Sequence, residues 1–163
     1  MLERKDIDPN RPDEYDRTPL VYASVTGHER LVKILLERES IDPNRPDKNN
    51  EGPLGWAAIN GHEGVAKLLL GRKDVDPNRP DEYDRTPLGS AAVKGHEGVV
   101  KLLLERENVD FNRPDMNDRT PLVCAAMEGH GGVVRLLLQR ENVDLIVKSP
   151  ALSFPHHYRT SPT

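Results

Sequence analysis

The feature that most constrains this chain is a 34-residue repeat. A segment related to Thr-Pro-Leu returns four times, beginning at Thr18, Gly52, Thr86 and Thr120. A Gly-His pair follows nine residues after each beginning, and a Leu-rich run closes each copy. Four copies at a constant period predict a stack of small units rather than a globule around one core. Stacks of this kind usually bind other molecules and seldom catalyse reactions.

Each copy begins with the pattern of a short helix, which the third copy shows most clearly. Thr86 can cap the free amides at a helix start, and Pro87 suits the first helical position because it needs no hydrogen-bond acceptor there. Leu88, Ala91 and Ala92 follow at helical spacing and form one apolar stripe. Gly95 can take the left-handed conformation that ends a helix. A helix from Pro87 to about residue 94 is therefore expected.

A second helix is expected over residues 99–106, the Leu-rich run of the same copy. Its apolar residues cover too wide an arc for a lone surface helix, so both flanks must be covered. Helices this short are marginal in water and need stacking. Pro, Asn and Asp dominate residues 107–119, which predicts turns and an extended connection. The unit is thus helix, turn, helix and protruding loop.

The pattern T-P-L-x-x-A-A-x-x-G-H-x-x-V-V-x-L-L-L resembles the ankyrin repeat over roughly residues 13 to 144. The resemblance implies an all-α solenoid of four stacked helix-turn-helix repeats with protruding loops. The repeat is one residue longer than usual, in the Asp-Pro-Asn-Arg-Pro-Asp loop. The His that usually follows T-P-L is replaced by Val21, Gly55, Gly89 and Val123. The usual turn Gly is replaced by Asp16, Asn50, Asp84 and Asp118, residue types that tolerate positive φ, so the turn should persist.

The period divides the chain into six segments. Residues 1–12 match the end of a preceding repeat, and repeats 1 to 4 span 13–46, 47–80, 81–114 and 115–148. Neither end of the array carries a recognisably polar capping repeat. The chain is then either a fragment of a longer array or covers its ends by end-to-end self-association. The tail, 149–163, is expected to be disordered, or else Leu145, Ile146, Val147 and Phe154 fold back as a cap.

Charge and composition exclude several classes of function. The net charge of −4 gives no global attraction to nucleic acid or to anionic membranes. Apolar runs of about five residues are too short to span a bilayer. A single cysteine, Cys124, cannot form an intramolecular disulfide framework, and the first residues do not resemble a signal peptide. We therefore expect an intracellular protein located in the cytoplasm, with the nucleus as the alternative location.

The side chains that could bind a metal or take part in a reaction do not form a recognisable site. Equivalent histidines in neighbouring repeats, about 8–10 Å apart as packed helices are, cannot share one metal ion. We expect each, namely His28, His62, His96 and His130, to brace its own helix–helix turn. The segment from Asp6 imitates the start of a calcium loop but has Arg11 and Arg17 where that loop needs Gly and Glu. Cys124 should pack as a small hydrophobe. No enzyme activity, metal or cofactor is predicted.

The resemblance places partner binding on a concave face formed by the loop tips and the exposed side of the first helices. At the tips this gives Glu14, Tyr15, Lys48, Asn49, Glu82, Tyr83, Met116 and Asn117. On the first helices it gives Tyr22, Val25, Thr26, Trp56, Ile59, Asn60, Val93, Lys94, Met127 and Glu128. The mixture of aromatic, aliphatic and adaptable polar groups is typical of a protein-binding patch.

Trp56 is the only tryptophan and lies in a copy that breaks the pattern with Glu51, Gly52 and Gly55. Two interpretations stay open from the sequence. Trp56 is an anchor for a partner, beside Tyr22 or Tyr83, or it fills the gap between repeats that Gly55 and Gly89 leave.

The function indicated is non-catalytic recognition of another protein, as part of something larger. Residues 8–20 and 76–88 are identical, which indicates duplication of a two-repeat block. Near-identical repeats with this loop resemble the ankyrin arrays of fungal proteins, among them multidomain receptors with a nucleotide-binding switch. The alternatives are a free-standing inhibitor of an enzyme such as a kinase, and a self-associating structural array.

Overall fold

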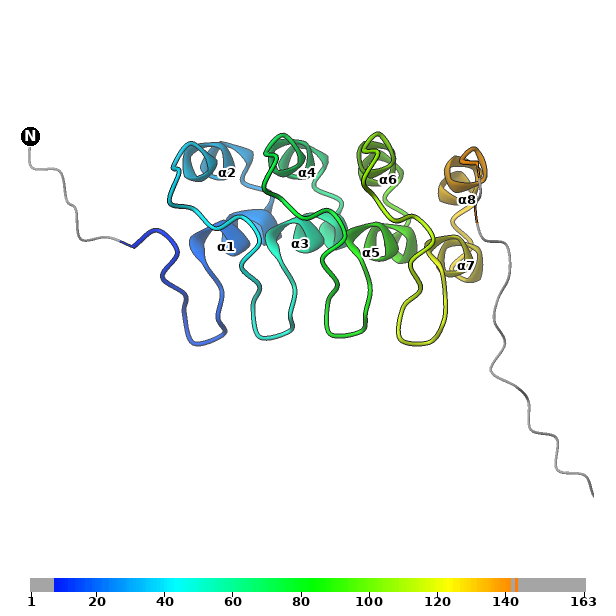
Figure 1. The fold of residues 1–163 in the computed structure, drawn as a ribbon, viewed down its shortest axis with the longest axis horizontal. Coiled ribbons are helices and arrows are strands. Elements are labelled where there is room, and N and C mark those ends of the chain that lie inside the picture. Colours follow the sequence, from blue (N-terminus) through cyan, green and yellow to red (C-terminus); the bar gives the residue numbers. More distant parts are fainter. Residues whose placement is uncertain (1–7, 142, 144–163) are drawn as a thin grey trace, which may run out of the picture.

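The computed structural model describes residues 8–141 and 143, which form eight helices in four pairs. The inner helices are α1 (Pro19–Thr26), α3 (Pro53–Asn60), α5 (Pro87–Lys94) and α7 (Pro121–Met127). The outer helices are α2 (Glu29–Leu36), α4 (Glu63–Leu70), α6 (Glu97–Leu104) and α8 (Gly131–Leu138). Figure 1 shows the two rows in sequence order, with a loop projecting below each inner helix. The expected all-α solenoid is confirmed.

The inner helices begin and end as the sequence predicts. Thr86 Oγ1 accepts a hydrogen bond from the Gly89 N–H at 3.2 Å, and Pro87 is the first residue of α5. Gly95 has φ +77°, which lets α5 end in the left-handed conformation. At α3 the capping Thr is replaced by Gly52, which offers no side-chain cap. The outer helix α6 starts at Glu97, two residues before the predicted start, because His96 already takes the N-cap position.

The apolar core runs continuously from one helix pair to the next. Leu88, Ala91 and Ala92 on α5 are fully buried, as the predicted stripe requires. Each inner helix contacts the next inner helix, and each outer helix contacts the next outer helix. On the outer helix α2, by contrast, Leu31 is 50% exposed and Ile34 is 48% exposed. The outer helices therefore depend on a neighbour at each flank, as their apolar pattern predicts.

The repeat histidines connect neighbouring repeats. His62 Nε2 lies 3.0 Å from the Val25 carbonyl of the preceding repeat, and His96 and His130 make the equivalent bonds to Ile59 and Val93. The prediction that each histidine braces its own turn is therefore wrong for His62, His96 and His130. The ring lies so close to the preceding repeat that a Cβ on Gly27 would come within 2.8 Å of His62. Glycine is needed at this place both for its positive φ and for this close approach.

A ladder of asparagine side chains ties the ends of the repeats together. Asn44 Nδ2 donates to the Asp74 carbonyl at 2.6 Å, and its Oδ1 accepts from the Asp76 N–H at 2.8 Å. Asn10 and Asn78 make the same pair of bonds one repeat before and one repeat after. The Asn of the Asp-Pro-Asn-Arg-Pro-Asp loop thus bridges two repeats through both of its amide atoms.

The loops keep the tight turn that the sequence predicts. Asp16, Asn50, Asp84 and Asp118 all have φ between +56° and +58°. Neighbouring tips are joined through the backbone, since the Glu82 N–H donates to the Asn49 carbonyl at 3.1 Å. The loops therefore form an ordered row beside the inner helices. The predicted tail and the alternative cap lie outside the described residues.

None of the helices in the described ranges has the length and apolar character that crossing a bilayer requires.

Replacing Asn44 with Ala should lower the free energy of unfolding by about 1–2 kcal/mol, because two bonds between repeats are lost. Denaturant unfolding followed by circular dichroism measures the change. Asn49→Ala, at an exposed loop tip, should cost less than about 0.5 kcal/mol. Equal effects of the two substitutions would contradict a role for the asparagine ladder.

Candidate protein-binding face

The residues predicted to bind a partner all lie on the loops and inner helices, and none of them is fully buried. We call this surface the concave face. Val25, Trp56, Ile59 and Val93 are half-buried and the remaining predicted residues are exposed. The predicted residues are therefore at least partly accessible in the structure.

An aspartate at the base of each loop organises this face. In repeat 2, Asp47 Oδ1 accepts hydrogen bonds from the N–H groups of Asn49 and Glu51, which fix the turn. Its Oδ2 accepts from Trp56 Nε1 at 3.0 Å. In repeat 1, Asp13 accepts from the Tyr22 hydroxyl at 2.6 Å, and this bond lowers the pKa of Asp13 and raises the pKa of Tyr22. The aromatic side chains are therefore held in place by the loops.

In repeats 1 and 3 an arginine beside the loop reaches toward the next repeat. Arg17 Nε lies 3.6 Å from Asp47 Oδ2, and its guanidinium carbon is 5.8 Å from the Tyr22 ring centre and 5.7 Å from that of Trp56. Two periods further on, Arg85 Nε lies 3.8 Å from Asp115 Oδ2. We call this place between neighbouring loops the arginine slot. Around Arg17 the slot combines a carboxylate of the following repeat with side chains of two inner helices.

Arg119, in the last described repeat, bonds to its own loop aspartate. Its Nε and Nη2 lie 3.0 Å and 2.7 Å from Asp115 Oδ2. Burial alone would raise the pKa of Asp115, but the hydrogen bonds from Arg119 and from the loop N–H groups hold it below its ordinary value. The same aspartate therefore faces arginines from two repeats.

Glu51 stands where the other three repeats have arginine. Its side chain is 4% exposed and lies over Gly55, where a Cβ would come within 1.5 Å of Glu51 Oε1. Burial, the charge of Asp81 and the charge of Asp47 raise the pKa of Glu51 to about 8, against weaker opposite effects of the Gly52 N–H and Arg79. No side chain in the described part of the chain forms a hydrogen bond or an ion pair with its carboxyl group.

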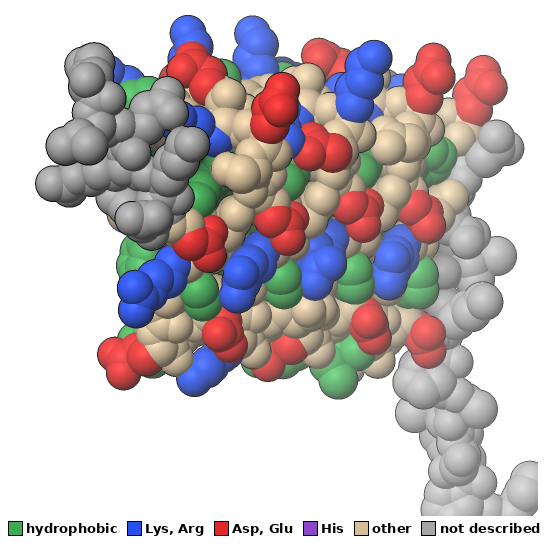
Figure 2. Space-filling model, turned by 60° about the vertical axis from the view of Figure 1, so that its left-hand side comes forward, with side chains coloured by type: hydrophobic (Ala, Val, Ile, Leu, Met, Phe, Trp, Pro, Cys, Tyr) green, Lys and Arg blue, Asp and Glu red, His purple; other side chains and the backbone are tan. Residues whose placement is uncertain are grey.

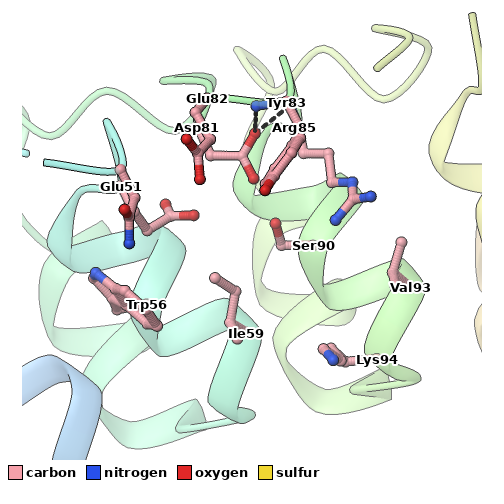
Figure 3. Close-up of a pocket in the computed structure, with 11 residues that line it drawn as sticks. Glu51, Trp56, Ile59, Asp81, Glu82, Tyr83, Arg85, Ser90, Val93 and Lys94 are labelled. Atoms are coloured by element: carbon pink, nitrogen blue, oxygen red, sulfur yellow. Dashed lines mark hydrogen bonds between the residues drawn. The ribbon is translucent and has the colours of Figure 1, made fainter. Parts of the chain in front are cut away.

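A pocket of about 160 Å³ opens beside Glu51, between repeats 2 and 3. Glu51, Trp56 and Ile59 line it from one repeat, and the lining side chains of the next repeat face them (Figure 3). The lining residues from the loops and α5 are Asn49, Asp81, Glu82, Tyr83, Arg85, Ser90, Val93 and Lys94. The volume is well above the roughly 15 Å³ that one water molecule requires.

Of the two interpretations of Trp56, the one in which it fills the gap left by Gly55 and Gly89 is wrong. The space over Gly55 is taken by the Glu51 side chain, and the atoms nearest to a Cβ on Gly89 belong to Thr86 and Arg85. Trp56 instead borders the pocket, with its ring nitrogen bound to Asp47.

Four pocket residues were not among the predicted site residues: Glu51, Asp81, Arg85 and Ser90. The repeat pattern itself could have pointed to Glu51, because the equivalent position is arginine in the other three repeats. The sequence shows the interruption, but it does not show that this position faces the next loop.

Cys124 is buried on α7, as predicted, with 4% of its surface exposed. Burial, followed by the nearby charge of Asp115, raises the pKa of its thiol. Among residues 8–141 and 143, no cluster of three His, Cys, Asp or Glu side chains is arranged to hold a metal ion.

Charged side chains lie in parallel rows across the repeats. Figure 2 shows acidic and basic rows side by side on the face turned toward the viewer. Because rows of positive and negative side chains alternate, the face shown in Figure 2 presents no large surface of a single charge.

A comparison with protein families identifies the same architecture. The family model "Ankyrin repeats (3 copies)" matches residues 1–81 and, in a second overlapping match, residues 54–149. The chain belongs to the ankyrin repeat family. Ankyrin repeats are generally protein–protein interaction modules and are typically non-catalytic.

Replacing Glu51 with Gln should stabilise the array increasingly as the pH rises. The folded state keeps its Glu51 proton up to about pH 8, whereas the unfolded chain ionises in the ordinary range. A raised pKa contributes stability at low pH that is lost as the pH rises through the folded-state value. The gain in Tm of Glu51→Gln over the parent should therefore grow from about pH 5 to about pH 8 and then level off. Thermal unfolding at a series of pH values measures it.

Glu105→Gln, at an exposed position after α6, is the matched control and should show no such trend. A Tm difference between Glu51→Gln and the parent that does not depend on pH would contradict the buried, protonated carboxyl group.

Proposed function

We propose that this ankyrin array recognises a protein partner through its concave face and does so without catalysis. The observation that supports this is the placement of the exposed apolar side chains. Of the eight large hydrophobic residues that are exposed in the described part of the chain, five lie on the concave face. They are Tyr15, Tyr22, Tyr83, Met116 and Met127, with exposures between 43% and 62%.

The three tyrosines among these side chains are suited to binding because the scaffold holds them in place. Tyr22 is fixed by Asp13, and Arg17 and Arg85 lie over the rings of Tyr15 and Tyr83 at 5.6 Å and 5.3 Å. Exposed aromatic groups of limited mobility lose little conformational entropy when a partner covers them. Tyrosine and methionine are also enriched at protein interfaces.

The proposal also includes the repeat boundaries, the cellular location and the wider protein context that the sequence indicates. The repeats are taken as 13–46, 47–80, 81–114 and 115–148, since each range holds one loop and one helix pair. The array acts in the cytoplasm as part of a larger protein of fungal type, and the alternative is a free-standing inhibitor that occupies one face of an enzyme such as a kinase.

A second candidate function, self-association, is supported by the apolar end of the array. Pro19, Tyr22, Ala23, Leu31, Ile34 and Leu35 line a recess of about 430 Å³ on α1 and α2. At the other inner and outer helices the equivalent side faces a neighbouring repeat. A second copy of the chain could supply that neighbour by stacking on α1 and α2.

Changing Tyr15, Trp56 and Tyr83 together to Ala should weaken capture of the partner from a lysate of the source organism by at least tenfold. The control carries Lys67→Ala and Lys101→Ala on the exposed side of the outer helices and should capture the partner as the parent does. Denaturant unfolding of each variant separates lost contact from lost folding. A folded triple variant that captures the partner as well as the parent would exclude the concave face.

Leu31→Glu combined with Ile34→Glu should abolish any dimer, because two charges would be placed against an apolar surface. Sedimentation equilibrium over micromolar concentrations measures the mass. If the parent is a monomer throughout this range, self-association is excluded.

A further inference from the structure

We infer that the pocket between repeats 2 and 3 receives the side chain of an arginine that a protein partner supplies. This inference rests on the proposed function, since it names the chemistry of the partner at the concave face. The array itself shows how an arginine is held at the equivalent place between repeats 1 and 2.

Between repeats 1 and 2 the arginine slot is occupied by Arg17, a side chain of the array itself. Arg17 lies between the rings of Tyr22 and Trp56, with its Nε 3.6 Å from the buried carboxylate of Asp47. A guanidinium group suits this place because its flat faces stack on aromatic rings while its edge faces a carboxylate. The first slot therefore shows which side chain this geometry accommodates.

Between repeats 2 and 3 the wall from the preceding repeat and the loop aspartate are present without the arginine, and Ser90 stands where the first slot has Trp56. Trp56 forms one wall, and Asp81 occupies the position of Asp47, with 9% of its surface exposed. The arginine position holds Glu51, whose shorter side chain folds back over Gly55. The result is a pocket of about 160 Å³, with an aromatic wall and two buried carboxyl groups.

The charges around the pocket favour a cation. Asp81 and Glu82 line it, against Arg85 and Lys94, and Glu51 adds a third negative charge when it ionises near pH 8. Arg85 already faces Asp115 of the next repeat at 3.8 Å and lies over the Tyr83 ring, and Lys94 is exposed at the rim. The carboxyl group of Glu51, in contrast, has no ion pair in the described part of the chain. The guanidinium group of a partner's arginine would supply the missing positive charge for that ion pair.

Ionisation of Glu51 should be coupled to binding. Its pKa is raised by burial and by the charges of Asp81 and Asp47, and Arg79 opposes this only weakly. A cation in the pocket favours the ionised form, so binding below about pH 8 should release a proton. Affinity should therefore increase with pH up to about that value and then become constant.

The test uses Trp56 as its reporter, since it is the only tryptophan in the chain and lines the pocket. The blocked tripeptide acetyl-Gly-Arg-Gly-amide is titrated into the full chain while tryptophan fluorescence is recorded. An isolated side chain should bind with a dissociation constant on the order of 1 mM. The peptide with citrulline, which has the same shape but no charge, should bind at least tenfold more weakly. The peptide with lysine should bind less tightly than the arginine peptide because it cannot stack.

Two variants and one control locate the site. Glu51→Arg restores the residue of the other repeats, so it should fill the pocket from within and abolish the fluorescence response. Glu51→Gln should reduce affinity about tenfold at pH 8.5 and remove the dependence on pH. Glu105→Gln should bind as the parent does. Circular dichroism of each variant shows whether it is folded.

The outcomes separate the two proposals. A saturable response to arginine that Glu51→Arg abolishes supports the arginine pocket. Equal responses to the arginine and citrulline peptides, or a folded Glu51→Arg variant that still binds, overturn it. If the peptides fail but the partner is still captured through Tyr15, Trp56 and Tyr83, then the arginine pocket is wrong and the proposed function stands.

Discussion

The structure depends on contacts that pass from each repeat to the next. Helices of seven or eight residues are marginal in water, and here they are held by apolar packing against the equivalent helices of neighbouring repeats. The histidine bond to the preceding repeat and the asparagine bridge to the following one add directional contacts at the same period. Cohesion is therefore local in sequence, and it leaves the loop tips and one side of the inner helices accessible.

Because the same contacts recur, a single departure from the pattern changes the surface at one defined place. Arginine at the loop base connects a repeat to the aspartate of the next loop, as Arg17 does with Asp47. Glu51 replaces that attraction with two carboxyl groups facing one pocket. The departure from the pattern at Glu51 thus coincides with a recess between repeats 2 and 3.

The repeat pattern predicted the helices, their caps and their stacking, because these follow from spacing and from residues with strict conformational preferences such as Pro87 and Gly95. The positive φ at Asn50 followed from the same preferences. The targets of His62 and the neighbours of Glu51 could not be predicted, since both lie across a repeat boundary, where the geometry of stacking decides which atoms meet. Sequence periodicity gives the unit, whereas the contacts between units require coordinates.

Removal of one full period tests the central claim most directly. Deleting residues 47–80 joins Pro46 to Asp81, which recreates the native junction, and brings Arg17 opposite Asp81 as it normally faces Asp47. The account predicts cooperative unfolding, unchanged helix content per residue and a lower free energy of unfolding. Deleting residues 47–62, which removes α3 and leaves α4 unpaired, should abolish cooperative folding. If the full-period deletion unfolds like the partial one, cohesion does not reside in equivalent contacts between neighbouring repeats.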